Sequence, residues 1–418
     1  MRGGHETNSC PAAVSEREKL TIAIAGGTAM GYLASLLAMF RAHTWLLDGQ
    51  GRPILDDFLV FWAAGHMALQ GKALSAYDPY LHHAAEVALA GHNFTGLLNW
   101  SYPPPFLFVA MLLASFPYAV AFFAWSIATL AFYAGAAAAI AKRYSAFVIA
   151  CAAPWVLTAL TPGQNGFLTA AIMGLSLLQL EKRPMTSGLL LGLLSYKPQF
   201  GILFPLALAA GGYWRAFAWA AASTLALNGL ACAVFGLDTL GGFLHALAGN
   251  TQSHLTNDGI SWGKIQSLYA LMRAFGAPAT MAWTLQALLS GLAAVTVALT
   301  WRSSVPYSLK AASLIAAAPL VTPYVFVYDL PILTMAIAFL FRHRGFDRVE
   351  FILLATTVPA VFVFLWLPAP SAFFASLAVA AISARRLFAA APLAGGIFRG
   401  VAKTTNALSA MQRIHSPL

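Results

Sequence analysis

Charged side chains are scarce in this sequence. Asp, Glu, Lys and Arg make up 9% of the 418 residues, whereas hydrophobic residues make up 60% and the mean hydropathy is +0.72. This composition excludes a soluble globular domain, which carries far more charge. The short alternating segments of a β-barrel are also missing, and long apolar runs extend from Leu20 to Phe388. The sequence therefore predicts an all-α polytopic membrane protein.

Cysteine is rarer still. Cys10, Cys151 and Cys232 lie far apart, and the last two fall within apolar runs, so there is no CxxC pair and no metal-binding spacing. We therefore expect inert thiols. The histidines, including the adjacent His82 and His83, also lack metal-ligand spacing, and we expect no metal site.

The apolar segments predict a bundle of roughly 10–13 transmembrane helices. The first, 21–40, has no clear small-residue cleavage site, so we interpret it as a retained helix and not as a signal peptide. The segment 104–140 is broken at Ser115-Phe116-Pro117. The remaining candidates are 146–160, 167–180, 185–196, 200–212, 216–235, 280–301, 311–321, 325–341, 349–367 and 372–382.

Basic residues sort to one side of the predicted bundle. If the N-terminus is cytoplasmic and each candidate crosses once, 18 of the 24 Lys and Arg residues face the cytoplasm, whereas eight of the 14 acidic residues face outward. This is the positive-inside bias, so the net charge of +10 reports membrane orientation and not a nucleic-acid partner. One crossing plus a re-entrant or interfacial piece in 104–140 preserves this orientation, and two full crossings would reverse everything downstream.

Two long external connections interrupt the predicted domain. We expect one transmembrane domain over 20–390, between cytoplasmic tails at 1–19 and 391–418, with external loops at 41–103 and 236–278. Long connections are usually functional, and they must cap a water-filled cavity or lie at the interface, because irregular backbone cannot face lipid. Within the first loop, one apolar face over 58–69 predicts a juxtamembrane helix.

Two adjacent carboxylates precede that juxtamembrane helix. Asp56 and Asp57 fall at its start, where aspartate is a favoured N-cap and suits the positive end of the helix dipole. Adjacent side chains point to different sides of a helix start, so one can cap while the other faces a cavity. A carboxylate in apolar surroundings has a raised proton affinity, which suits a general base, and we assign that role to Asp57, with Asp56 as the alternative base.

Three further motifs supply polar and aromatic groups at predicted external helix ends. WSYPPPFLF (100–108) is typical of a loop that ends at a helix start, with aromatics at the membrane interface. Alternatively, it forms a rigid edge of a cavity that includes Trp100 and Tyr102. TPGQNGF (161–167) offers the amides of Gln164 and Asn165 in a short turn. Lys197, in SYKPQFG (195–201), either extends its ammonium to water or contacts a phosphate.

The motif TPYVFVYDL (322–330) carries another carboxylate at membrane depth. Asp329 is predicted to lie a few residues inside the helix 325–341. Intramembrane carboxylates are costly and usually functional. The alternative for Asp329 is a hydrogen bond to a nearby tyrosine. Tyr328 is, like Asp329, a candidate residue of the substrate cavity.

The motifs occur in an order that resembles glycosyltransferase family 87. The ordered set is Asp57-Phe58, GKALSAYDP (71–79), YPPPF (102–106), FPYAVAFFAW (116–125), GQN (163–165) and KPQF (197–200). The resemblance covers roughly residues 20 to 370. The family comprises polyprenyl-phosphate-sugar-dependent transferases of the GT-C superfamily, including the mycobacterial α-1,2-mannosyltransferases.

This resemblance implies a GT-C-like helix bundle with juxtamembrane helices and a cavity open on the extracytoplasmic side. It implies a bacterial inner (plasma) membrane protein whose active site faces the periplasm or cell exterior. Asp57 matches the catalytic base, and Lys197 matches a Lys-Pro element near the donor phosphate. The donor is a lipid-phosphate sugar, with no nucleotide and no metal. Mycobacterial members carry a histidine-rich element where this chain reads TPYVFVYDL, so mannose and the acceptor class stay open.

The residues suggest the following hypothesis for the reaction. Lys197, helped by Arg41 or Lys264, holds the phosphate of a polyprenyl-phosphate sugar, and Asp57 takes the proton of the acceptor hydroxyl. Trp100, Tyr102 and Trp262 stack on sugar rings. The sugar, mannose or another hexose or pentose, passes to a lipid or glycan acceptor with inversion. The alternatives are a flippase or transporter without chemistry, which predicts inverted repeats, and a structural subunit of an envelope assembly.

Overall fold

The structure, a computed structural model, describes residues 16–96, 98–255, 262–364, 366–367 and 369–390. The regular elements of these residues are all helices, accompanied by two isolated β-bridges. The predicted tails at 1–19 and 391–418 lie outside the described residues, except for 16–19, which begin the first helix.

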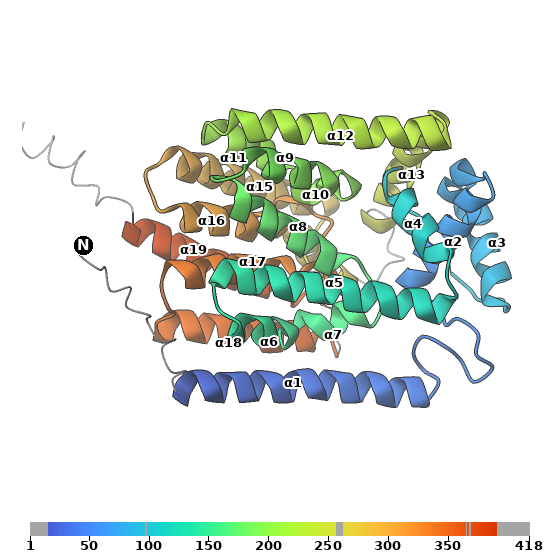
Figure 1. Cartoon of the computed structure of the whole chain (residues 1–418), viewed down its shortest axis with the longest axis horizontal. Coiled ribbons are helices and arrows are strands. Elements are labelled where there is room, and N and C mark those ends of the chain that lie inside the picture. The colour runs from blue at the N-terminus through green and yellow to red at the C-terminus, as the bar shows by residue number, and fades with distance from the viewer. Residues whose placement is uncertain (1–15, 97, 256–261, 365, 368, 391–418) are drawn as a thin grey trace, which may run out of the picture.

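Long apolar helices run side by side along the bundle (Figure 1). Within the described residues, five helices are long and apolar enough to cross a membrane: α1 (Glu16–Arg41), α5 (Tyr118–Ala141), α12 (Trp214–Phe235), α15 (Ala279–Arg302) and α19 (Phe373–Ala390). Their outer faces stay uncovered by protein; Leu225 on α12 is 73% exposed and Leu288 on α15 is 65% exposed. Such faces are stable only in lipid. The chain is an all-α polytopic membrane protein, as predicted.

Shorter helices fill the bundle between the long ones. They are α6 (Ser145–Cys151), α7 (Trp155–Leu160), α8 (Gly166–Gln179), α9 (Pro184–Leu193), α10 (Pro198–Gly201), α11 (Leu203–Ala210), α16 (Tyr307–Val321), α17 (Ile332–His343) and α18 (Arg348–Val363). The segment predicted as one helix over 146–160 is divided after Cys151, because Pro154 precedes Trp155 and cannot continue a hydrogen-bonded helix.

The predicted break after residue 114 separates α4 (Phe106–Ala114) from α5. Helix α4 has nine residues, too few to cross a bilayer. It packs closely against α2 (Asp57–Leu69), since a Cβ on Gly65 would lie 2.0 Å from the carbonyl oxygen of Ala110. Helix α4 is thus a short piece packed at one end of the bundle, and α5, with 24 residues, is the part of this segment long enough to cross a membrane.

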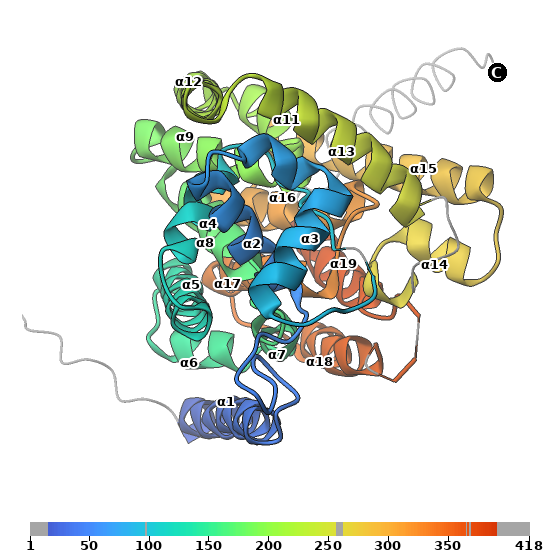
Figure 2. The same cartoon turned by 90° about the vertical axis from the view of Figure 1, so that its right-hand side faces the viewer.

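The two predicted external loops are largely helical and gather at one end of the bundle (Figures 1 and 2). The first contains α2, η1 (Ala73–Tyr77) and α3 (Pro79–Ala90), and the second contains α13 (Asp238–Leu255), η3 (Trp262–Lys264) and α14 (Leu268–Ala274). Helix α2, which has 13 residues, is too short to span a membrane and lies where a juxtamembrane helix was predicted.

The opposite end of the bundle carries many of the basic side chains. Arg143, after α5, donates to Glu18 at the start of α1 over 3.1 Å, and Arg342, near the end of α17, donates to the carbonyl of Ile140. Buried Glu350 pairs there with buried Arg386 over 2.7 Å. The structure therefore separates a cationic end of the bundle from the end that carries α2.

Candidate active site

Asp56 caps helix α2. Its Oδ1 accepts hydrogen bonds from the backbone N–H groups of Phe58 at 2.9 Å and Leu59 at 3.1 Å, and from the hydroxyl of Tyr118 at 3.0 Å. Burial raises the pKa of the Asp56 carboxyl to about 7. Oδ1 of Asp56 is therefore occupied at the helix start, whereas its Oδ2 is buried with no hydrogen-bond partner among the described residues. Asp57, the first residue of the helix, makes none of these capping contacts.

Asp57 is half-buried and is held by the turn before α8. Its Oδ2 accepts a hydrogen bond from Nε2 of Gln164 at 3.0 Å, and Oε1 of Gln164 accepts from the hydroxyl of Tyr102 at 3.1 Å. The amide is oriented by Asp57, because an ionised carboxylate only accepts, and by the backbone N–H of Asn165, which donates to Oε1 of Gln164 at 3.3 Å. One oxygen of Asp57 remains without a described protein partner.

The turn itself depends on Gly163, whose φ of +63° favours glycine. Trp125 of α5 donates from its indole Nε1 to the carbonyl of Gly163 at 3.0 Å. A Cβ on Gly163 would also lie 2.6 Å from the ring of Phe122. These contacts fix the turn against α5, so the two amide side chains that follow have defined positions.

Lys197 lies between an amide and a carboxylate. Its Nζ donates to Oδ1 of Asn165 and to Oδ1 of Asp329, both at 2.5 Å, and all three side chains are buried. Nδ2 of Asn165 is also buried and has no hydrogen-bond partner among the described residues. Removing two charges from water is favourable only when they are paired and hydrogen-bonded, as these are.

Asp329 lies before helix α17 and not inside it, which differs from the prediction. Pro331 is the N-cap of α17, so the helix starts at Ile332, and Asp329 ends the short 3-10 helix η4 (Val327–Asp329). Oδ2 of Asp329 accepts from the backbone N–H of Phe326 at 3.0 Å, which leaves Oδ1 for Lys197. The local backbone therefore aims this carboxylate.

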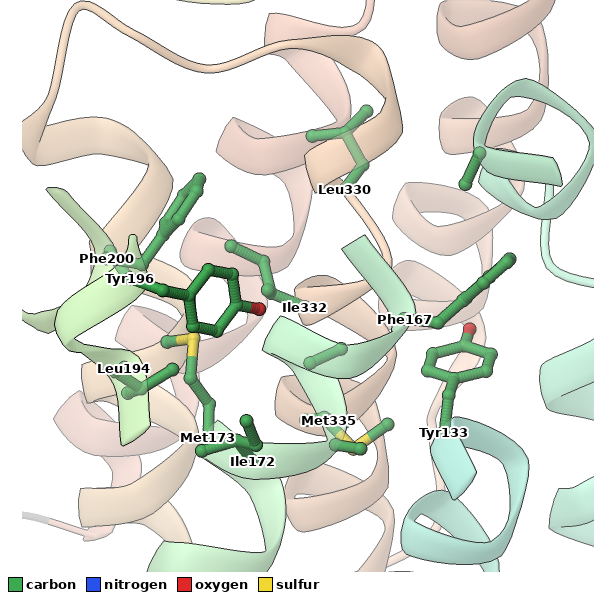
Figure 3. Close-up of a cluster of buried hydrophobic side chains, with 14 of the residues drawn as sticks. Tyr133, Phe167, Ile172, Met173, Leu194, Tyr196, Phe200, Leu330, Ile332 and Met335 are labelled. Carbon is green, nitrogen blue, oxygen red and sulfur yellow. The ribbon is translucent and has the colours of Figure 1, made fainter. Parts of the chain in front are cut away.

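Close backbone packing joins η4 to the start of α8. A Cβ on Gly166 would lie 1.9 Å from the carbonyl oxygen of Tyr328, so only glycine fits there. Figure 3 shows part of the apolar core, to which Phe167, Tyr196 and Leu330 contribute. These three are sequence neighbours of the polar residues Asn165, Lys197 and Asp329, so the apolar core holds the backbone that carries the polar cluster.

Lys264 reaches the same region from the second external loop. Residues Ile265 and Phe326 form an isolated antiparallel bridge, and Gln266 donates its backbone N–H to Val325 over 2.6 Å. The side chain of Lys264 is exposed. Burial raises the pKa of the Asp57 carboxyl, and the hydrogen bond from Gln164, followed by the positive charges of Lys264 and Lys197, acts against that increase.

The predicted sugar-stacking aromatics differ in exposure. Trp100 is 1% exposed and stacks on Phe106 at 5.9 Å between ring centroids, so its ring is covered by protein. Tyr102 and Trp262 are half-buried. Trp262 contacts the guanidinium of Arg273 through its ring at 5.4 Å. The ring of Tyr328 lies 5.7 Å from Nζ of Lys197.

Arg41 ends α1 and is exposed. In the part of the chain that the structure describes, no hydrogen bond or ion pair joins Arg41 to the cluster of Asp57, Gln164, Lys197 and Asp329. Conversely, sequence reasoning did not single out Tyr118. Its hydroxyl donates a hydrogen bond to Asp56, which lies 62 residues earlier in the chain. The sequence feature that could have indicated Tyr118 is its place in the aromatic motif 116–125.

The cluster combines three chemical capacities. Asp57 is a carboxylate with a raised pKa and one oxygen without a described partner, Lys264 is an exposed ammonium whose charge acts on that carboxylate, and the buried amide nitrogen of Asn165 is a donor without an acceptor among the described residues. A carboxylate of this kind can accept a proton from a bound hydroxyl, and an ammonium beside it can hold an anionic leaving group.

Comparison with models of known protein families identifies the family of this chain. The model of glycosyltransferase family 87 matches residues 100–323, which is more than half of the chain. This range contains Tyr102, Gln164, Lys197 and Lys264, whereas Asp57 lies outside it. A search of curated proteins and a search of solved structures each found no match. Because the family model covers more than half of the chain, this protein belongs to glycosyltransferase family 87.

Proposed function

We propose that this membrane glycosyltransferase moves a sugar from a polyprenyl-phosphate donor to a lipid or glycan acceptor at the membrane face opposite the cytoplasm. Family membership supports the transferase activity. The observation that carries the finer proposal is half-buried Asp57, whose carboxyl is influenced by the positive charge of exposed Lys264, at the bundle end that also contains the Lys197–Asp329 pair.

In the proposed reaction, Asp57 is the general base. The acceptor hydroxyl oxygen bonds to the anomeric carbon while its proton passes to the carboxylate of Asp57. The bond between the anomeric carbon and the phosphate oxygen breaks, and the electron pair leaves with the polyprenyl phosphate. Direct displacement of this kind inverts the anomeric centre. Gln164 orients the carboxylate through its 3.0 Å hydrogen bond.

Two lysines have different roles in this proposal. Lys264 is exposed and holds the donor phosphate, so that its charge stabilises the leaving group. Lys197 is already paired with Asp329 and Asn165, and a phosphate that reached it would have to compete with a carboxylate at 2.5 Å. Lys197 therefore orients the site and adds positive potential. Arg41, at the end of α1, is near the membrane surface where a donor headgroup approaches.

The sugar is mannose or another hexose or pentose, and Tyr102, Trp262 and Tyr328 supply the aromatic faces on which its ring stacks. The donor and the acceptor are both membrane-associated, which agrees with a site at one end of the helix bundle. We propose that this protein resides in the bacterial inner membrane with the site facing the periplasm or cell exterior, because the basic residues gather at the opposite end.

Replacement of Asp57 by Asn tests the base assignment. Purified protein in lipid nanodiscs receives a radiolabelled polyprenyl-phosphate sugar and membrane extract, and the product is a new glycolipid or glycan. We expect D57N to lower the transfer rate about 10²–10⁴-fold while the protein stays folded. Asp48→Asn is the matched control, since Asp48 is an acid of the same loop paired with Arg52 at 2.8 Å. Wild-type transfer by D57N would reject the assignment.

Membrane-impermeant thiol reagents test the orientation in intact cells. Asn93→Cys places an exposed thiol in the first external loop, and Arg348→Cys places one at the cationic end. We expect labelling of the first variant alone without permeabilisation and of both after permeabilisation. Labelling of Arg348→Cys alone would place Asp57 in the cytoplasm and overturn the proposed sidedness. Movement of an intact lipid-linked sugar across the membrane, with no new glycosidic bond, would favour the transporter instead.

A further inference from the structure

A cavity lies at the cationic end of the bundle, away from Asp57. Its volume is about 320 Å³, and its lining includes Glu181, Lys182, Tyr307, Ser308, Arg342 and His343. These residues lie at the end of α8, the start of α16 and the end of α17. The opposite ends of α8 and α17 adjoin Asn165 and Asp329. Because α8 has 14 residues, the two places are roughly 20 Å apart.

The two cations of this cavity make no ion pair among the described residues. Among the described residues, the ammonium of Lys182 has no hydrogen bond or ion pair. The guanidinium of Arg342 makes one long contact, 3.4 Å from its Nη1 to the carbonyl oxygen of Ile140. Both side chains are exposed. Two unpaired cations that face one cavity attract an anion, and the Arg342 fork can bind two oxygens of a phosphate.

Neutral donors line the same cavity. Helix α16 begins at Tyr307 after Pro306, and its 15 residues give it a full first turn. The backbone N–H groups of Tyr307 and Ser308 have no intrahelical acceptor, because they belong to that first turn. The hydroxyl of Ser308 has no described partner, whereas the hydroxyl of Tyr307 donates to Leu177 over 2.6 Å. The cavity therefore offers N–H and O–H donors beside its two cations.

We propose that this cavity binds a phosphate ester. Lys182 and Arg342 supply the charge, and Ser308 with the start of α16 supplies neutral donors. Glu181 also lines the cavity and leaves one net positive charge when His343 is neutral. One net charge matches a phosphodiester, which carries a single negative charge. The ligand is the headgroup of an anionic phospholipid at that membrane face, or a soluble phosphate ester with the same chemistry.

Binding to the full-length protein in detergent tests this proposal separately from sugar transfer. The probes are short-chain phosphatidylglycerol, glycerophosphoglycerol, which is the same diester headgroup without acyl chains, and uncharged short-chain diacylglycerol, with binding measured by titration calorimetry. We expect saturable binding of phosphatidylglycerol, weakened about tenfold by Arg342→Gln and further by the double variant with Lys182→Gln. Both positions are exposed, so these variants should fold. Equal binding of glycerophosphoglycerol would identify a soluble ligand and support the proposal.

Two control variants separate the cavity from its surroundings. Arg348→Gln removes an exposed charge at the same end but outside the cavity lining, and it should bind like wild type. Asp57→Asn should also bind like wild type, because the candidate active site lies at the other end. The proposal is overturned if no phosphate-bearing probe binds saturably. It is equally overturned if the double variant keeps wild-type affinity or if diacylglycerol binds as tightly as phosphatidylglycerol.

Discussion

Removing either partner of the Lys197–Asp329 ion pair should destabilise the protein strongly, whereas removing both partners should not. Nζ and Oδ1 lie 2.5 Å apart, and the side chains are 5% and 1% exposed. Lys197→Met keeps most of the apolar stem but removes the charge, and it leaves Asp329 as an uncompensated buried anion. Asp329→Asn removes the opposite charge and leaves a buried ammonium. The double variant has neither charge.

The size of each effect follows from burial. Removing one partner of a buried pair costs about 3–5 kcal/mol, because the remaining charge loses both water and its counterion. Asn165 partly compensates the ammonium left by Asp329→Asn, since its Oδ1 still accepts at 2.5 Å. We therefore expect Lys197→Met to be the more destabilising single change. Replacing both partners is often nearly neutral, so the double variant should lie within about 2 kcal/mol of wild type.

A double-mutant cycle measures this coupling. Tryptophan fluorescence follows unfolding as SDS replaces a mild detergent, and the free energy of unfolding is compared among the four proteins. Lys72→Met is the control, because Lys72 is an exposed lysine at the same end of the bundle. The predicted coupling is refuted if Lys197→Met lowers the free energy of unfolding by less than about 1 kcal/mol. It is also refuted if the effects of the two single variants simply add in the double variant.

Three other substitutions test separate parts of the structure. Because burial raises the pKa of Asp56 to about 7, the folded state binds more protons than the unfolded state above pH 4, and stability falls as pH rises toward 7. In thermal unfolding from pH 5 to 8, Asp56→Asn should therefore lose less stability with rising pH than the wild type does. An unchanged pH dependence would contradict this. Gly166→Ala places a Cβ 1.9 Å from the carbonyl oxygen of Tyr328 and should cost about 1–3 kcal/mol in the same unfolding assay. The control Gly229→Ala, with open space around its Cβ, should not destabilise; equal losses would refute the clash. Arg386→Met leaves a buried carboxylate of α18 with one fewer cation and should lower the free energy of unfolding by about 3–5 kcal/mol, whereas a loss below 1 kcal/mol would show that the neighbouring arginines compensate.

Most of the fold was predictable because hydrophobic segments are a local property of the chain. The segments 21–40, 216–235 and 280–301 match α1, α12 and α15 to within a few residues, apart from an earlier start of α1. The break at Ser115–Pro117 was also visible, since proline ends helical hydrogen bonding. Two predicted helices differ from the structure at a proline: 146–160 is divided at Pro154, and 325–341 begins after Pro331, so that Asp329 precedes the helix. Both prolines are visible in the sequence, but whether a proline kinks or ends a helix depends on packing.

The candidate site was predictable in its parts. Charge, turn chemistry and proline placement singled out Asp57, Gln164, Lys197 and Asp329 one at a time. Lys197 illustrates the limit of this reasoning. A lysine at membrane depth needs an anionic partner, and the sequence offered both a substrate phosphate and several carboxylates. The structure pairs it with Asp329, which shifts the proposed phosphate contact to Lys264.

By itself the sequence determined the class of protein, its apolar helices and the unequal distribution of positive charge, because each depends on residues close together in the chain. Only the tertiary structure decided which polar groups meet. Asp57 and Gln164 are 107 residues apart, and Lys197 and Asp329 are 132 apart. Contacts across such separations arise from helix packing, as where Gly166 admits the backbone of Tyr328, and no local pattern encodes that packing.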